Sequence, residues 1–158
     1  MEPYRTFLIT GATRGIGRAL SDKLSGQGHL VVGIARHVDA GFPGVLYTAD
    51  LSSADETRVV LLKITENHEI HGIVNNVGVA LPQQLGNIDI QTFLNVMDIN
   101  VRVAVQITQA LVSNMKSRGW GRIVNVCSRA IFGATDRTAY AAAKSALVGC
   151  TRTWALEL

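Results

Sequence analysis

The sequence contains little cysteine and no long apolar run. Its two cysteines, Cys127 and Cys150, lie inside apolar patterns at no spacing that metal ligands use. We therefore expect free thiols in a reducing compartment rather than a disulfide. No stretch approaches the roughly 18 apolar residues that a membrane helix needs, and the chain begins with Glu2 and Pro3 rather than with a basic and then apolar leader. These features predict a cytoplasmic protein without a membrane span.

Charge is also sparse, at 17% of the 158 residues, against 47% apolar residues and a net charge of +3. Lysine and arginine form no run, which favours small anionic ligands over a nucleic-acid partner. The length and the apolar content predict one domain with a single core over residues 1–158. His68 and His71 form the one close histidine pair, and because no third ligand accompanies them we expect surface histidines and no metal site.

A glycine-rich turn separates an apolar run from a helical pattern near the start of the chain, with the sequence Thr10-Gly11-Ala12-Thr13-Arg14-Gly15-Ile16-Gly17. Its glycines remove side chains where the backbone bends, where a pyrophosphate approaches and where the helix packs against the strand. Ordinary turns also collect glycine. The strand-turn-helix context nevertheless favours a phosphate site at the free amides and the helix dipole.

Apolar segments of strand length alternate with segments of helical periodicity along the whole chain. Strands are expected over 5–10, 30–35, 45–49, 70–76 and 122–128, and helices over 15–27, from a cap at Ser52 or Ser53 to 67, over 90–116 and over 138–158. Right-handed crossovers then require a parallel sheet with helices on both faces. The fold class is α/β, a doubly wound Rossmann-type sheet in three layers.

The last two expected helices have surfaces that a partner could cover. Residues 90–116 are apolar around most of the helix circumference, which indicates more than one packing partner. On the last helix, small residues repeat at helical spacing as Ala142, Ala146, Gly149 and Thr153. A homo-oligomer interface through both helices and burial within one subunit are equally compatible with this pattern.

Tyr140 and Lys144 lie four residues apart, so one helix face carries both, about 6 Å apart along the axis. A nearby ammonium favours the phenolate form of tyrosine and moves the pKa of the phenol toward neutrality. Ser128 ends the preceding strand and therefore lies at the carboxyl edge of the sheet, where doubly wound folds bind ligands. A tyrosine and a lysine at this spacing also arise by chance on solvated helix faces, but their position after the strand that ends in Ser128 favours a site in which the phenol acts as an acid or a base.

The sequence resembles the short-chain dehydrogenase/reductase family over its whole length, and the motifs that carry the resemblance occur in the same order as in the family. The glycine turn matches the family's TGxxxGxG, Asp50-Leu51 matches its adenine-contacting acid, and Asn75-Asn76-Val77-Gly78 matches its NNxG motif with valine in place of alanine. The family's catalytic tetrad falls on Asn100, Ser128, Tyr140 and Lys144.

The resemblance implies a role for each matched residue. Tyr140 would exchange a proton with the substrate oxygen, Ser128 would hydrogen-bond that oxygen, Lys144 would hold the nicotinamide ribose and depress the pKa of the tyrosine, and Asn100 would anchor a water. Hydride would move between the nicotinamide and the substrate carbon. The implied cofactor contacts are Gly11, Thr13, Arg14, Gly15, Ile16, Gly17, Arg36, Asp50, Leu51, Asn76, Gly78, Tyr140 and Lys144.

The second expected strand bears on which nicotinamide cofactor is used. It ends Ile34-Ala35-Arg36, so no carboxylate is available at Ala35 for a ribose 2′-hydroxyl. Arg14 could join Arg36 around a 2′-phosphate. We therefore expect NADP(H) rather than NAD(H), with a 3-oxoacyl thioester as the nearest substrate by resemblance.

Two departures from the family pattern remain. Ser128 precedes Tyr140 by 12 residues, one fewer than usual, and Cys127 occupies the alternative register. Family members also continue past the position of Leu158 through further strands and a substrate loop. A chain ending there is expected to fold poorly and not to catalyse. The rival to the enzyme hypothesis is a non-catalytic dinucleotide-binding module or an inactive fragment.

Overall fold

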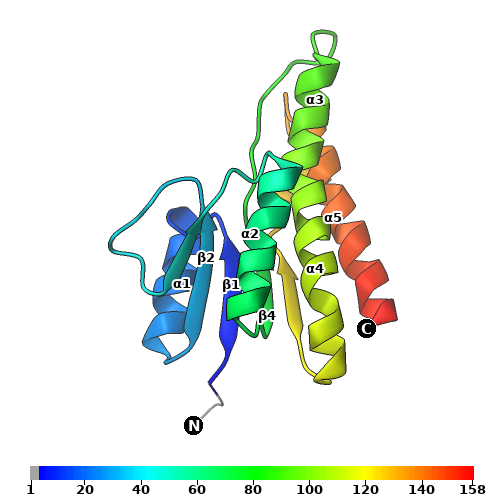
Figure 1. Cartoon of the computed structure of the whole chain (residues 1–158). Helices are drawn as coiled ribbons and strands as arrows, with labels where there is room; N and C mark the ends of the chain where they lie inside the picture. The colour runs from blue at the N-terminus through cyan, green and yellow to red at the C-terminus, as the bar shows by residue number, and fades with distance from the viewer. Residues whose placement is uncertain (1–3) are drawn as a thin grey trace.

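Strands and helices alternate along the chain in a computed structural model that describes residues 4–158. The strands are β1 (Thr6–Thr10), β2 (Leu30–Ala35), β3 (Val45–Thr48), β4 (Gly72–Asn75) and β5 (Arg122–Asn125). The helices are α1 (Gly15–Gly26), α2 (Ala54–Asn67), α3 (Ile90–Met97), α4 (Val103–Ser117) and α5 (Thr138–Glu157), with a π-helical turn at Asp98–Arg102 and a 3-10 turn at Arg129–Phe132. Figure 1 shows α3, the π turn and α4 following one another as a long rod beside α5.

The five strands form one parallel sheet in the order β3-β2-β1-β4-β5. The chain builds outward from β1 to β3 and then returns to the other side of β1 with β4. This reversal creates a switch point between β1 and β4, where the loops that follow the strands diverge. The central strands are buried throughout most of their length, as strands covered on both faces must be.

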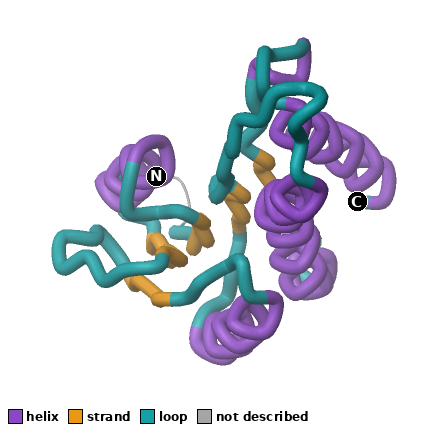
Figure 2. Tube along the Cα trace, turned by 90° about the horizontal axis from the view of Figure 1, so that it is seen from above, coloured by secondary structure: helices purple, strands orange, loops and turns teal. Residues whose placement is uncertain are grey.

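Helices cover both faces of the sheet (Figure 2), which confirms the doubly wound α/β class. On one face, Ile9, Val31 and Val74 pack with Leu20 and Leu24 of α1. The opposite face carries the larger core, in which strand residues pack against α2 and α4; it includes Leu8, Ile34, Ile73, Val60, Ile64, Ile107 and Leu111. None of the helices in the described range 4–158 combines the length and the apolar character that crossing a membrane requires.

Three local features differ from the sequence-based expectations. β4 and β5 are shorter than 70–76 and 122–128, because the residues at their ends leave the ladder to form loops at the sheet edge. Ser53, not Ser52, caps α2 by accepting a hydrogen bond from the Glu56 amide. The expected continuous helix over 90–116 is interrupted by the π turn, where Asn100 Nδ2 donates to the Val96 carbonyl at 2.8 Å and competes with the backbone ladder.

The surfaces singled out on the last helices are open in the single chain. Leu94 of α3 is 51% exposed, and Val105 of α4 is 41% exposed. Along the small-residue stripe of α5, Ala142, Gly149 and Thr153 are also exposed. Intrachain burial therefore does not account for the small residues at these positions.

Candidate active site

A hollow at the switch point collects residues from the carboxyl ends of four strands. We call it the switch-point hollow. Its wall includes the glycine turn, the end of β2, the β3-α2 loop and the loop after β4, and its predicted members are Gly11, Thr13, Arg14, Arg36, Asp50, Leu51 and Gly78. Asn95, Asp98 and Ile99 line the same hollow from α3 and the π turn. The topology thus brings together segments that lie far apart in the sequence.

Thr10 and Asn76 hold the glycine turn against the loop after β4. The Thr10 hydroxyl oxygen accepts hydrogen bonds from the backbone amides of Asn76 at 3.0 Å and of Val77 at 2.9 Å. In return, Asn76 Nδ2 donates to the carbonyl oxygens of Thr10 at 2.9 Å and of Gly11 at 3.3 Å. The predicted Asn76 therefore fixes the shape of the turn.

The glycines of the turn serve different geometric purposes. Gly11 and Gly15 have φ angles of +62° and +54°, which side chains rarely adopt. A Cβ at Gly17 would collide with the Gly11 carbonyl oxygen, so this glycine permits the close approach of α1 to the turn. A Cβ at Gly15 would meet no atom within 4 Å, which leaves the outer side of the turn open. Ile16 is 65% exposed beside it.

Two arginines give the switch-point hollow a positive rim. Arg14 and Arg36 are exposed, and neither guanidinium forms an ion pair with another residue of the described part of the chain. The Ser52 amide donates to Asp50 Oδ1 at 3.0 Å, and this bond, with a smaller contribution from Arg36, lowers the pKa of the Asp50 carboxyl. Arg18 anchors the adjoining loop through Asp39 Oδ2 at 2.7 Å.

Ser128 and Tyr140 line a second hollow, together with residues of the 3-10 turn and the start of α5. The Ser128 hydroxyl oxygen accepts a hydrogen bond from the Ala130 amide at 3.2 Å and so caps the 3-10 turn. Cys127 is placed differently, because its Sγ donates to the Lys144 carbonyl oxygen at 3.4 Å. Of the two registers, Ser128 is therefore the one that shares a hollow with Tyr140.

Lys144 is buried beside Tyr140, with 2% of its surface exposed. Its Nζ donates to the Val126 carbonyl oxygen at 2.9 Å and lies 5.7 Å from the centroid of the Tyr140 ring. Burial lowers the pKa of the Lys144 ammonium, against a smaller opposing effect of Cys127. The ammonium is thus held close to the phenol that it was predicted to influence.

Asn100 lies near this lysine, because both side chains approach Gly78. Its Nδ2 donates to the carbonyl oxygens of Val79 and Val96, both at 2.8 Å, whereas its buried Oδ1 has no hydrogen-bond partner within residues 4–158. A Cβ at Gly78 would lie 2.6 Å from Asn100 Oδ1 and 3.3 Å from Lys144 Nζ. Because Gly78 also lines the switch-point hollow, Asn100 and Lys144 lie at the border of that hollow, and Lys144 in turn lies beside Tyr140.

Some residues that shape this region were not predicted from the sequence. Arg18 was missed, and so was the ion pair of Arg102 with Asp98, whose 2.6 Å contact joins the two ends of the π turn. The sequence carried a signal for the Arg102–Asp98 ion pair, since opposite charges four residues apart are unusual in an otherwise apolar helix.

The histidine pair has structural contacts. His71 Nδ1 accepts from the Thr6 amide at 3.2 Å, and His68 Nε2 lies 3.0 Å from the Tyr47 hydroxyl oxygen. Both residues are half-buried rather than on the open surface, because His71 contacts the start of β1, and His68, at the end of α2, contacts β3. Among residues 4–158, no group of three or more metal-ligating side chains comes together.

A parallel sheet of this order, with a tight glycine turn at its switch point, defines the nucleotide-binding class of doubly wound α/β proteins. Within that class, the chain belongs to the short-chain dehydrogenase family, whose model matches residues 5–158. The 3-oxoacyl-[acyl-carrier-protein] reductase of Thermotoga maritima is 31% identical over 96% of this chain and 67% of its own length. The L-xylulose reductase of Caenorhabditis elegans is 33% identical over 98% and 66%, respectively.

Solved structures agree with this assignment. A metagenomic short-chain oxidoreductase in complex with NADP superposes with a TM-score of 0.89 at 27% identity, over 98% of this chain and 75% of that one. A short-chain dehydrogenase from Streptomyces avermitilis gives a TM-score of 0.92 at 25% identity, over 99% and 61%. The chain spans about two thirds of the length of the curated relatives it matches, at 67% and 66% of the first two.

Proposed function

We propose that this chain belongs to an oxidoreductase that transfers a hydride between NADP(H) and a carbonyl or alcohol substrate. One observation carries the proposal. Tyr140 shares a hollow with the Ser128 hydroxyl and lies 5.7 Å, from ring centroid to Nζ, from the buried Lys144 ammonium. A phenol placed between a hydrogen-bond donor for substrate and a buried cation is suited to exchange a proton with a substrate oxygen.

The switch-point hollow fits a dinucleotide. The open outer side of the glycine turn leaves backbone amides free for a pyrophosphate at the start of α1. Asp50 and Leu51 would contact the adenosine, while Gly78, Lys144 and Tyr140 would flank the nicotinamide ribose. Gly11, Thr13, Gly15, Ile16 and Gly17 would hold the phosphates, with Asn76 behind them. When bound, the cofactor supplies the hydride donor or acceptor.

The positive rim favours NADP(H) over NAD(H). Arg14 and Arg36 line the hollow without ion-pair partners in the described range, and Ala35 offers no carboxylate for a ribose 2′-hydroxyl. A 2′-phosphate would supply the negative charge with which neither guanidinium group is paired in the described range. The bound NADP of the metagenomic relative supports this choice.

In the direction of reduction, the substrate carbon receives the hydride while its oxygen receives the proton of the Tyr140 hydroxyl. The Ser128 hydroxyl donates a hydrogen bond to that oxygen and stabilises the charge that develops on it. The Lys144 ammonium lowers the free energy of the phenolate that remains. Asn100 Oδ1, buried without a partner in the described range, is the acceptor available to a water that returns the proton. Oxidation of the alcohol reverses these steps.

For the substrate we propose a 3-oxoacyl thioester, as the name of the Thermotoga maritima relative suggests. The L-xylulose reductase is about equally similar and acts, by its name, on a sugar, so the activity must be measured with both kinds of carbonyl. We also propose that the protein is a homo-oligomer through residues 90–116 and 138–158, where Leu94, Val105, Ala142, Gly149 and Thr153 are exposed in the single chain.

The deciding experiment replaces Tyr140 by Phe in the complete natural protein and follows NADPH oxidation with a β-keto ester. Loss of the proton donor should lower kcat by at least about 100-fold, while the NADPH dissociation constant stays within about threefold. Tyr47→Phe is the matched control, because its hydroxyl contacts only His68 among the hydrogen bonds of the described chain. A Tyr140→Phe protein that keeps more than a few per cent of the wild-type rate would contradict the proposal.

A further inference from the structure

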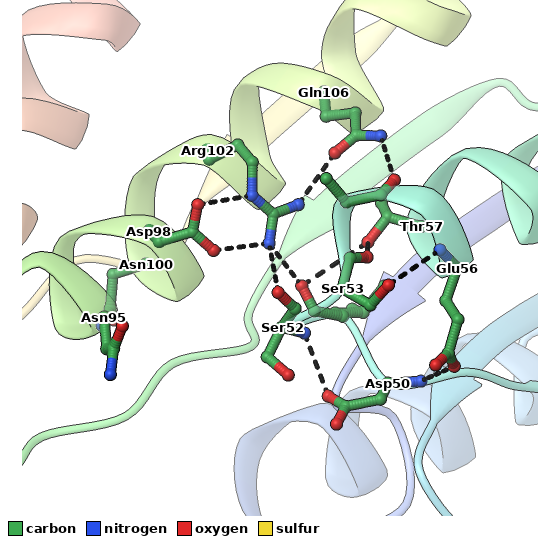
Figure 3. Close-up of polar contacts among 12 residues, drawn as sticks. Asp50, Ser52, Ser53, Glu56, Thr57, Asn95, Asp98, Asn100, Arg102 and Gln106 are labelled. Carbon is green, nitrogen blue, oxygen red and sulfur yellow. Dashed lines mark hydrogen bonds and ion pairs between the residues drawn. The ribbon is translucent and has the colours of Figure 1, made fainter.

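Arg102 joins the wall of the switch-point hollow to the π turn that carries Asn100 (Figure 3). Its Nη2 donates to the Leu51 carbonyl oxygen at 2.7 Å and to that of Ser52 at 3.3 Å. The same guanidinium makes a bidentate pair with Asp98, from Nε at 2.7 Å and from Nη2 at 2.6 Å. All of these contacts leave its side chain only 24% exposed.

Gln106 extends the contact by one helical turn. Arg102 Nη1 donates to Gln106 Oε1 at 2.8 Å, and Gln106 Nε2 donates to the Ala54 carbonyl oxygen at 2.9 Å. The β3-α2 loop and the start of α2 are therefore fastened to the π turn and to α4 at three carbonyls, those of Leu51, Ser52 and Ala54. We call this set the Arg102 cluster: Leu51, Ser52, Ala54, Asp98, Arg102 and Gln106.

Helix capping does not explain these bonds. The first turn of α2 has its own cap, because Ser53 Oγ accepts from the Glu56 amide at 3.2 Å and Glu56 Oε2 accepts from the Asp50 amide at 2.9 Å. Arg102 instead binds carbonyl oxygens of Leu51 and Ser52, residues that line the switch-point hollow. Its bonds therefore connect the β3-α2 loop, which faces the switch-point hollow, with the π turn.

We propose that Arg102 is a positioning residue that couples occupation of the adenosine side of the hollow to the order of the π turn and hence to the placement of Asn100. The part concerning Asn100 rests on the proposed function. A guanidinium is a rigid planar fork, so a shift of the β3-α2 loop is passed to Asp98 rather than absorbed by rotation. The π turn interrupts the α-helical hydrogen-bond ladder, so it is the segment whose opening the coupling would suppress.

The coupling can be measured without turnover by hydrogen exchange on the complete natural protein, with adenosine 2′,5′-bisphosphate as the probe. In the wild type, saturating probe should slow exchange of the amides of residues 98–102 by roughly threefold or more, because a bound ligand suppresses local opening of the segment that it orders. In Arg102→Met the probe should still bind, and its effect on these amides should disappear. Arg58→Met is the matched control, because Arg58 is 61% exposed and makes only a 3.6 Å pair with Asp55.

Arg102→Lys provides a second variant in case Arg102→Met does not fold. Lysine keeps a charge for Asp98 but lacks the fork that reaches Leu51 and Ser52, so it should also lose the coupling. In a protein that oxidises NADPH, either variant should lower kcat as well as raise the KM for NADPH. If Arg102 had a purely structural role, its substitution would lower the melting temperature but leave kcat and the KM for NADPH unchanged.

The proposal is overturned if the probe fails to slow exchange at residues 98–102 in the wild type, or if either Arg102 variant retains the wild-type effect. Loss of the effect in the variants, with Arg58→Met unchanged, supports it. Because the probe carries no nicotinamide, this result stands even for a protein that does not oxidise NADPH, in which case the proposed function fails alone.

Discussion

Arg36 and Arg14 come from different loops and share one rim of the switch-point hollow. If they bind a 2′-phosphate, Arg36→Ala should weaken NADPH binding about tenfold, which corresponds to the loss of one charge-assisted hydrogen bond. NADH binding should change less than twofold, because NADH has no 2′-phosphate. Calorimetric titration of the wild type and the variant with both cofactors tests this, and an equal loss for both would contradict it.

The buried Lys144 makes the stability of the fold depend on pH. Burial lowers the pKa of its ammonium, so between the folded and the unfolded pKa the unfolded chain binds more protons. Its contribution to the free energy of unfolding therefore rises with pH through this window and levels off above the unfolded value of 10.5. Urea unfolding of the wild type and of Lys144→Met over this pH range measures the free energy of unfolding of both proteins. The difference between the two free energies should shift in favour of the wild type as the pH rises, and a constant difference would contradict the prediction.

Short-range spacing was enough to predict some residues of the candidate active site. Tyr140 and Lys144 are one helical turn apart, and Ser128 follows an apolar strand, so pattern alone placed them at one edge of the sheet. The turn-holding role of Asn76 is different, because its partners Thr10 and Gly11 lie 66 and 65 residues away. Such a contact follows from the pairing of β1 with β4, and no local pattern carries it.

At the scale of elements, the contact between α1 and the glycine turn depends on Gly17. Gly17→Ala should destabilise the protein by about 2 kcal/mol or more, because the added methyl group overlaps the Gly11 carbonyl oxygen. Gly26→Ala is the matched control in the same helix, since its Cβ meets no atom within 4 Å. That change should stabilise by roughly 1 kcal/mol through helix propensity. Denaturant unfolding of both variants tests the difference, and equal effects of the two changes would refute the explanation.

The order of the elements was predictable, and so were several of their ends, such as both ends of β2, whereas β4 and β5 are shorter than expected. Alternation of apolar and amphipathic segments identified the strands of the sheet and, with α3 and α4 taken as one helix, the helices that cover it. The interruption of the helix over 90–116 was not visible, because the residues around Asn100 are helix-compatible and the π turn is maintained by bonds to Val79 and, through Arg102, to Leu51. Both acceptors are carbonyl oxygens, which every residue has and which therefore leave no trace in the sequence.

At the scale of the whole molecule, the sheet and its helices leave a side of the chain uncovered. α3 contacts α5, yet Leu94 of α3 and Val105 of α4 remain exposed, and so do Ala142, Gly149 and Thr153 of the small-residue stripe of α5. Close approach of helices requires small residues at the contact, and apolar residues beside it gain free energy when covered. The two features together suit a second copy of the same chain.

Gly149 offers a test of this assembly. Its Cβ position meets no atom within 4 Å, so Gly149→Arg adds a long side chain without disturbing the single subunit, and it improves helix propensity in α5. If α5 packs closely on a partner, the variant should sediment as a smaller species than the wild-type complete protein at the same concentration. Gly26→Arg, in an equally open helical position on α1, should leave the sedimentation unchanged. Identical sedimentation of wild type and Gly149→Arg would show that oligomers, if they form, do not use this stripe.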